Sequence, residues 1–310
     1  MDEKGFIGYM ESKNLSITTQ KAYLFKLQQF FQWAETEDIQ VTKLDILHYL
    51  EYLKNCRELQ NVSRQNSLFA LNHYFTYLCQ SEQIAQNPCN FIKLRGTKVK
   101  KLCNLYTVEQ LDELYDNFYN VYIRNFQTSK YFGKATEEYI QLTRKRNLVV
   151  LGIMVYQGLL ANEVKNIRLE DINLHKGTVR IASSKRGKER VLPLKVAQIG
   201  ALMDYLQYVK PQLEILYKTT DYEVFLFSVE NQNFKDVLHY IKKQIRKIDG
   251  NFKDFYQVRT SVITNWLKIN DLRKAQYLAG HRSIKCTENY LPNNLESLID
   301  DINNLHPFNL

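Results

Sequence analysis

The chain has 310 residues, of which 45% are hydrophobic and 24% are charged, a balance typical of a soluble globular protein with about two domains. This composition excludes an intrinsically disordered chain and a collagen-like repeat. Its 42 basic and 33 acidic residues give a net charge of +9, which favours a polyanionic partner but equally fits a solvated surface.

The cysteine pattern and the absence of long apolar stretches predict the compartment. The 5 cysteines are scattered without CxxC spacing, so we expect neither a disulfide framework nor a zinc site. Residues 1–14 carry acids where a signal peptide carries bases, and no stretch reaches about 18 consecutive apolar residues. We therefore expect a cytoplasmic protein that does not enter a membrane.

Residues 1–92 are expected to form a small helical domain. Apolar residues recur at helical intervals between residues 6 and 78, where Gly and Pro are almost absent. Ser16 and Thr42 are expected to cap the helices that carry residues 23–34 and 44–53, and Ser63 to open a helix that runs to residue 79. The helical run is expected to stop near Pro88, because proline disfavours helical geometry in the residue before it.

Residues 93–104 are expected to link this domain to a second one. Between residues 93 and 101 the segment has five bases, no acid and one glycine. Such a segment can follow the phosphates of a nucleic acid or be only a solvated linker. Its basic residues are Lys93, Arg95, Lys98, Lys100 and Lys101.

Residues 105–310 are expected to form the second domain. Residues 107–110 have the pattern of a capping box, which reopens helical structure at Leu111. Residues 178–181 and 190–194 alternate as the strands of a hairpin with a basic tip, after a turn at residues 171–174. The fold class is therefore mainly α with a small β-hairpin or sheet in the second domain. Its helices are expected at residues 144–156, 162–167, 196–209, 234–248 and 256–267, and from Asp271 to Gly280.

Several polar residues of the second domain lie where packing does not require them. Each has an ordinary structural explanation when it is taken singly: a salt bridge for an arginine, a helix end for the histidine that follows Gly280, and core packing for a tyrosine. The spacing of the whole set carries more information than any member. The residues are Lys185, Arg186 and Lys188 at the hairpin tip, Arg259, His281 and, nine residues later, Tyr290.

The order of these residues resembles the tyrosine recombinase, or phage integrase, family over nearly the whole chain. The segment QGLLANE at 157–163 is similar to the box Thr-Gly-Leu-Arg-x-x-Glu, and KRGKERVLPL at 185–194 to the hairpin Lys-x-x-Lys-Glu-Arg-x-x-Pro-Leu. YQVR at 256–259 matches His-x-x-Arg, and LAGH at 278–281 followed by Tyr290 matches Leu-Gly-His and its tyrosine. The helical domain that closes on Asn87-Pro88 resembles the family's core-binding domain.

The resemblance implies a site and a reaction. Tyr290 would attack a DNA phosphodiester to give a 3′-phosphotyrosyl link, with no metal and no other cofactor. Arg259 and His281 would stabilise charge on the phosphate oxygens, and Lys185 would protonate the leaving 5′-oxygen. DNA contacts are expected from the basic linker and from Lys188.

Two positions depart from the family pattern. Leu160 stands where the first catalytic arginine belongs, and because it cannot form a hydrogen bond, a nearby cation would have to replace the missing donor. The candidates by sequence are Arg186, Arg180 and Arg168. Tyr256 stands where a histidine belongs; its phenol can still donate a hydrogen bond to phosphate, or it is a core aromatic.

Two functions follow as hypotheses. The first is a site-specific recombinase or integrase of a mobile element, which binds double-stranded DNA sites as a dimer that pairs into a tetramer. Its C-terminal segment has apolar residues at helical spacing from Leu295 to Leu305 and would dock on the neighbouring protomer. The second is a catalytically impaired relative that binds DNA as an accessory or architectural protein. The resemblance covers integration, excision, resolution and transposition alike.

Overall fold

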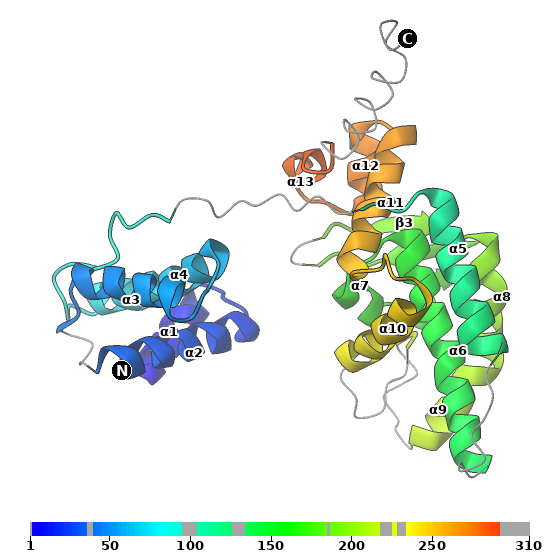
Figure 1. Cartoon of the computed structure of the whole chain (residues 1–310), viewed down its shortest axis with the longest axis horizontal. Helices are drawn as coiled ribbons and strands as arrows, with labels where there is room; N and C mark the ends of the chain where they lie inside the picture. Colours follow the sequence, from blue (N-terminus) through cyan, green and yellow to red (C-terminus); the bar gives the residue numbers. More distant parts are fainter. Residues whose placement is uncertain are drawn as a thin grey trace, which may run out of the picture. The chain divides into compact units, whose positions relative to one another are not determined.

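The computed structural model describes residues 2–35, 40–94, 104–125, 134–184, 187–217, 225–227 and 234–291. The chain divides into two compact units, Met1–Lys101 and Leu102–Leu310, both drawn in Figure 1. This division falls inside the segment 93–104 that was expected to link two domains. In the described ranges no helix is both long and apolar enough to span a membrane.

The first unit consists of α1 (Glu3–Ser12), α2 (Ile17–Ala34), α3 (Lys43–Asn55) and α4 (Asn61–Gln80). The predicted caps of α2 and α3 are confirmed: the Ser16 side chain accepts a hydrogen bond from the backbone of Thr19, and Thr42 forms a capping box with Asp45. The prediction for α4 was wrong, because that helix begins at Asn61 and Ser63 lies within its first turn. Buried aromatic and aliphatic side chains from all four helices form one core.

The second unit is also mostly helical. The capping box of Thr107 and Gln110 is confirmed and opens α5 (Val108–Phe118). The predicted helix at residues 144–156 is the second part of a longer helix, α6 (Lys134–Gln157), which packs against α5, α8 and α11 (Figure 1). The predicted helix at 196–209 continues further, as α8 (Val196–Asp204), the π-helix η4 (Tyr205–Val209) and α9 (Lys210–Tyr217). The remaining elements are η2 (Tyr119–Arg124), α7 (Ala161–Lys165), η3 (Leu169–Asp171), α10 (Phe234–Ile248), α11 (Phe255–Ile269), α12 (Leu272–Ala279) and α13 (Ile284–Glu288).

A three-stranded antiparallel sheet completes the second unit, with the order β1 (Ile172–Asn173), β2 (Thr178–Ile181) and β3 (Arg190–Pro193). The segment predicted as a turn at residues 171–174 instead supplies β1, because Ile172 pairs with Val179 of β2. In the β2–β3 pair, Ile181 lies opposite Arg190. Along β3 the side chains alternate between buried and exposed, with Arg190 and Leu192 facing inward. The fold class predicted from the sequence, mainly helical with a small sheet, is therefore confirmed.

Two glycines end the helices that frame the next region. Gly158 (φ +56°) follows the last residue of α6, and Gly280 (φ +70°) follows the last residue of α12. These left-handed conformations favour glycine and let the chain leave each helix sharply. As a result, the backbone carbonyl groups at the ends of α6 and α12 both lie beside α11.

Candidate active site

Arg259 lies in the second turn of α11 and reaches the ends of two other helices. One terminal nitrogen, Nη1, donates to the carbonyl oxygen of Gly158 at 2.6 Å, and the other, Nη2, donates to the carbonyl oxygen of Ala279 at 2.9 Å. The negative end of a helix dipole favours a cation, so these carbonyl groups hold the guanidinium although its side chain is only 6% exposed. Arg259 therefore places a fixed positive charge where α6, α11 and α12 meet.

His281 follows the end of α12 directly and contacts Arg259. Its Nε2 lies 3.3 Å from Nη2 of Arg259, and its Nδ1 lies 2.9 Å from Oγ1 of Thr287. Burial lowers the pKa of His281 to about 4, and the positive charges of Arg259 and Arg190 act in the same direction. The imidazole is therefore neutral at pH 7. Because Arg259 can only donate, we assign Nε2 as the acceptor and Nδ1–H as the donor to Thr287.

Tyr290 stacks on this histidine. The two ring centroids are 5.7 Å apart and the ring planes are inclined by 19°. Burial raises the pKa of Tyr290, while the nearby charge of Arg259 opposes the rise. The hydroxyl is thus protonated at neutral pH, and it lies in a half-buried position beside a cation and a neutral imidazole. The structure brings together three of the residues singled out from the sequence.

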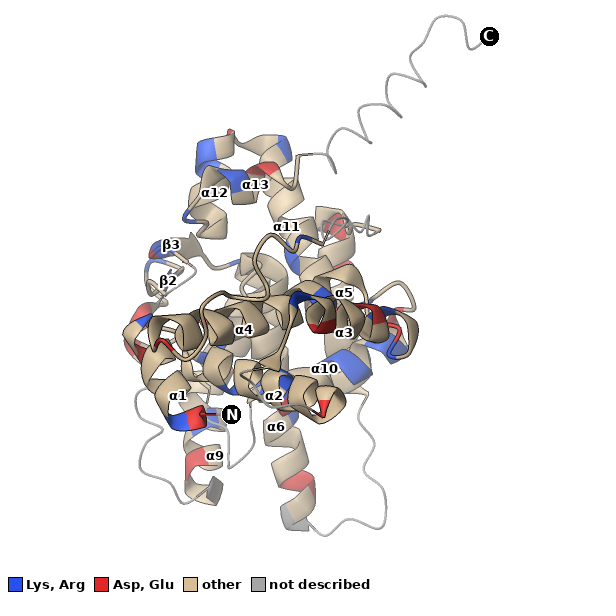
Figure 2. Ribbon diagram, turned by 90° about the vertical axis from the view of Figure 1, so that its left-hand side faces the viewer, with Lys and Arg blue, Asp and Glu red and all other residues tan. Residues whose placement is uncertain are grey.

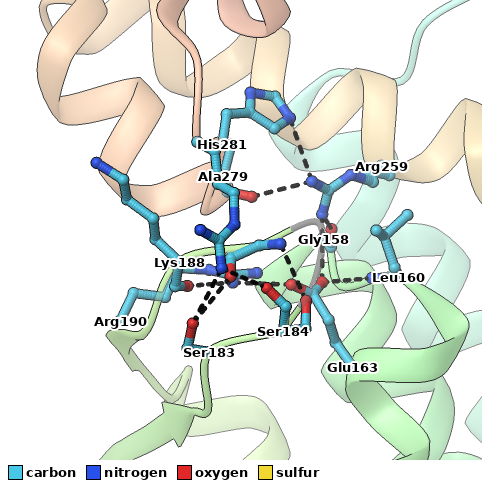
Figure 3. Close-up of polar contacts among 12 residues, drawn as sticks. Gly158, Leu160, Glu163, Ser183, Ser184, Lys188, Arg190, Arg259, Ala279 and His281 are labelled. Atoms are coloured by element: carbon cyan, nitrogen blue, oxygen red, sulfur yellow. Dashed lines mark hydrogen bonds and ion pairs between the residues drawn. The ribbon is translucent and has the colours of Figure 1, made fainter. Parts of the chain in front are cut away.

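Two further residues complete this group, and sequence reasoning assigned no role to either. Arg190, on β3, donates from Nη1 to Oε1 of Glu163 at 2.8 Å, and Nη1 of Arg259 lies 3.6 Å from Oε2 of the same carboxylate. Figure 3 shows the two guanidinium groups directed at Glu163. One sequence signal was available: Arg190 belongs to a strand whose alternation directs every second side chain inward. We call Glu163, Arg190, Arg259, His281 and Tyr290 the Arg259 cluster.

The pKa of Glu163 reflects these contacts. Burial raises it, but the hydrogen bond and the charge of Arg190 outweigh that effect, so the pKa lies below its ordinary value. The second carboxylate oxygen accepts a hydrogen bond of 2.9 Å from the backbone nitrogen of Leu160. Glu163 is therefore a charged carboxylate that ties α7 to β3.

The β2–β3 hairpin is joined to the turn that carries His281. Gly187 forms an isolated antiparallel bridge with His281, and the backbone nitrogen of Lys188 donates to the carbonyl oxygen of Gly280 at 2.9 Å. Nη2 of Arg282 donates to the carbonyl oxygen of Ser184 at 2.7 Å. These contacts anchor both sides of the hairpin tip beside the cluster (Figure 3).

Leu160 and Tyr256, the two positions expected to depart from the family pattern, are both at the surface. The Leu160 side chain is 42% exposed, and its backbone rather than its side chain contacts Glu163. Tyr256 is 61% exposed and lies one turn before Arg259 on α11, so it is not a core aromatic.

Two of the arginines considered as replacements for the arginine expected at position 160 pair with acidic side chains. Arg180 pairs with Glu189 at 2.8 Å and with Asp171 at 3.3 Å, and it points to the exposed face of β2. Arg168 pairs with Glu170 at 3.3 Å. The basic residues Lys93 and Lys188 are exposed. The other residues predicted to act at the site or on DNA lie outside the described residues: Lys185 and Arg186, the linker residues Arg95, Lys98, Lys100 and Lys101, and the C-terminal segment from residue 292.

The cluster has the properties of a phosphate site. It places the guanidinium of Arg259 beside a neutral imidazole and a phenol, and a guanidinium matches the geometry of phosphate oxygens. Further Lys and Arg residues mark α10, α12 and α13 in Figure 2. Within the described ranges, no three His, Cys, Asp or Glu side chains are placed to hold a metal ion.

Comparisons with known proteins find two family models that match the chain. A family model described as "Phage integrase family" matches residues 126–296, and one described as "Phage integrase, N-terminal SAM-like domain" matches residues 4–85. The TnP I resolvase of Bacillus thuringiensis is 26% identical over 94% of this chain and 96% of its own length. A tyrosine recombinase XerC of Leptospira interrogans is also 26% identical, over 98% of this chain and 92% of its own length.

Solved structures share the fold. The XerH site-specific recombinase, in a post-cleavage complex with a palindromic difH substrate, is similar with a TM-score of 0.68 and 19% identity. The match covers 94% of this chain and 81% of that one.

Proposed function

The chain belongs to the phage integrase family of tyrosine recombinases, and from this premise we propose that it cuts and rejoins DNA through a 3′-phosphotyrosyl intermediate. The observation that carries the proposal is the stacking of Tyr290 on His281, which itself lies 3.3 Å from the buried guanidinium of Arg259. A phenol beside a fixed cation and a neutral imidazole is suited to attack on a phosphodiester.

The first step is binding of the scissile phosphate at the Arg259 cluster. An incoming phosphodiester carries one negative charge, which the buried guanidinium of Arg259 attracts and which raises the proton affinity of His281. The exposed side chain of Tyr256, one helical turn before Arg259, would donate a hydrogen bond from its hydroxyl to the same phosphate. Binding thus brings the donors of Arg259 and Tyr256 to the non-bridging oxygens, and leaves Nε2 of His281 free to accept a proton.

The second step is attack by Tyr290. Its oxygen forms a bond to phosphorus, the bond from phosphorus to the 5′-oxygen breaks, and Lys185 donates a proton to that 5′-oxygen. His281, neutral at pH 7, is the group of the cluster that can accept the phenolic proton. Attack by a 5′-hydroxyl reverses these transfers and rejoins the DNA, so the reaction needs no external energy source.

The assembly on DNA is part of the proposal. XerH was solved with its difH DNA substrate, and we propose that this chain likewise binds double-stranded sites, as a dimer that pairs into a tetramer. The segment after Leu291 would dock on a neighbouring protomer. An apolar groove of about 340 Å³ in the second unit, lined by Leu111, Tyr156, Leu194 and Trp266, has the character that such an amphipathic segment requires.

The cellular setting is also part of the proposal. The similarity to a resolvase called TnP I supports resolution as the reaction. We propose that the chain acts on a mobile element and in the cytoplasm. The basic linker would follow the phosphate backbone between the two units.

A nicked suicide substrate tests the proposed activity. A duplex selected from a random pool by binding, with a nick beside the scissile phosphate, should trap the wild-type chain covalently because the short released strand diffuses away. Tyr290→Phe, which removes only the hydroxyl, should bind the same duplex with unchanged affinity and form no covalent product. Equal trapping by both chains would contradict the assignment of the nucleophile.

A second function is favoured by one observation. Leu160 presents an apolar, half-exposed side chain at the position of the family's first arginine, and the loss of one preorganised donor costs about 10²- to 10³-fold in rate. A chain that binds the selected duplex but gives no covalent product under any condition would be a DNA-binding accessory or architectural protein.

A further inference from the structure

Arg190 is a buried charge with an unusual set of contacts. Its side chain is 0% exposed, and Nη1 contacts Oε1 of Glu163 at 2.8 Å and, more weakly, the carbonyl oxygen of Lys188 at 3.4 Å. Its Nε and Nη2 are buried and have no hydrogen-bond partner in the described part of the chain. A buried guanidinium is costly unless a charge compensates it, so the carboxylate of Glu163 is what allows Arg190 to face inward.

The two carboxylate oxygens of Glu163 lie closer to Arg190 and to the backbone of Leu160 than to Arg259. Arg190 and the backbone nitrogen of Leu160 take the short contacts, at 2.8 and 2.9 Å, whereas Arg259 lies 3.6 Å away, beyond hydrogen-bond distance. The terminal nitrogens of Arg259 instead donate hydrogen bonds to backbone carbonyl groups, which are neutral. The negative charge of Glu163 is therefore compensated mainly by Arg190, and the positive charge of Arg259 is not cancelled.

These contacts determine the net charge of the Arg259 cluster. Two guanidinium groups and one carboxylate leave one net positive charge, and His281 adds none at pH 7. Without Arg190, the carboxylate would neutralise Arg259, and the buried cluster would offer no net charge to an incoming phosphate. With leucine at position 160, no other guanidinium contacts this carboxylate within the described residues.

We propose that Arg190 is a positioning residue that, by pairing with Glu163, leaves the charge of Arg259 available to the scissile phosphate. This inference rests on the proposed function. It explains how the site would bind a phosphate without an arginine at position 160. Arg190 acts through the carboxylate and does not touch the DNA, because all its unpaired nitrogens are buried.

A double-mutant cycle tests the inference. Arg190→Met should lower single-turnover cleavage of the nicked duplex by about 100-fold, comparable to the loss of one preorganised donor. Glu163→Gln keeps the hydrogen-bonding shape and should lower it by less than about tenfold. The double variant removes both compensating charges, so we expect cleavage to recover to within about tenfold of wild type.

The double variant also keeps the test decisive if Arg190→Met does not fold, because it removes the buried carboxylate charge together with the arginine that compensates it. Arg190→Lys, which retains the charge, should keep most of the activity. The inference would be overturned by an Arg190→Met variant that cleaves at the wild-type rate. It would also be overturned by a double variant that cleaves more than about 100-fold more slowly than Glu163→Gln alone. The second result would mean that Arg190 itself contacts the reacting phosphate or maintains the fold.

Binding of inorganic phosphate separates this inference from the proposed function. The NMR resonance of the His281 ring should shift on titration with phosphate, with an affinity reduced at least about fivefold in Arg190→Met and restored in the double variant. If wild type never cleaves DNA but phosphate binding follows this pattern, the proposed reaction fails and the role of Arg190 stands. Equal phosphate affinity in wild type and Arg190→Met overturns the role of Arg190 alone.

Discussion

Arg282 donates a hydrogen bond of 2.7 Å to the carbonyl oxygen of Ser184, and thereby joins the turn after α12 to the tip of the β2–β3 hairpin. Ser184 immediately precedes Lys185, the proposed donor of a proton to the leaving 5′-oxygen. The same turn carries His281. The contact therefore joins the segment that would bind the phosphate oxygens to the segment that would protonate the leaving group.

Arg282→Ala should impair the protonation of the leaving group more than the binding of phosphate. We expect cleavage of an ordinary duplex to fall about tenfold, since a positioned general acid contributes about 10²- to 10⁴-fold and the hairpin would be only partly released. A duplex with sulfur in place of the 5′-oxygen needs no proton on its leaving group, so the variant should cleave it within about threefold of wild type.

Lys285→Ala is a matched control for Arg282→Ala, because it removes an exposed charge from α13 and should affect both duplexes equally. An Arg282→Ala defect of the same size on both duplexes would contradict the role of the contact.

Adding a guanidinium at position 160 should increase activity. Leu160 is half-exposed at the cluster, so Leu160→Arg can reach a bound phosphate, and we expect single-turnover cleavage to rise at least about tenfold. Leu160→Gln adds a hydrogen-bond donor without a charge and should stay within about threefold of wild type. An unchanged rate in Leu160→Arg would show that the cluster does not lack a donor.

The buried histidine makes stability depend on pH. The pKa of His281 is about 4 in the folded chain and lies near its ordinary value of 6.5 after unfolding. Between these values the unfolded chain binds more protons, so this stabilisation is complete above pH 6.5 and is lost as the pH falls toward 4. After allowance for solvent screening of a partly exposed ring, the loss should be ~1–2 kcal/mol.

Denaturant unfolding of wild type and His281→Asn at several pH values measures this term, because the variant retains every other titrating group. The difference in the free energy of unfolding between the two chains should shrink as the pH is lowered. Parallel curves would contradict a neutral, buried imidazole.

Gly280 should tolerate no side chain. A Cβ atom at this position would lie 2.2 Å from Nη1 of Arg190, and the backbone has φ +70°. Gly280→Ala should therefore destabilise the chain by ~2–4 kcal/mol through strain and overpacking together. Gly177→Ala is the control. Gly177 has φ +59° and no atom within 4 Å of the added carbon, so only backbone strain should lower the stability of this variant. Equal losses in the two variants would place Arg190 away from Gly280.

Neutralising Lys98, Lys100 and Lys101 together tests the basic linker. If these residues contact phosphates, the slope of log binding constant against log salt concentration should become shallower by about 2 to 3, since each contact contributes about 0.9. Fluorescence anisotropy on one duplex between low and moderate salt measures the slope. An unchanged slope would leave the segment as a solvated linker.

The helices were predictable where their signals are local. Thr107 and Gln110 cap α5, and Asp271 and Gly280 bound α12, because each cap depends on residues within one turn of the helix end. The start of α4 was misplaced because Ser63 offers a cap that the chain does not use. The strand β1 was missed because two residues have no pattern of their own and become a strand only by pairing with β2.

By itself, the sequence determined the family and three members of the cluster, Arg259, His281 and Tyr290, because a motif is an order of residues along the chain. Only the tertiary structure decided which arginine pairs with Glu163. Arg180 and Arg190 both belong to the β2–β3 hairpin, but the strand register turns the first toward solvent and the second toward the carboxylate, 27 residues away in the chain. Burial of a charge depends on what packs over it, and sequence spacing does not contain that information.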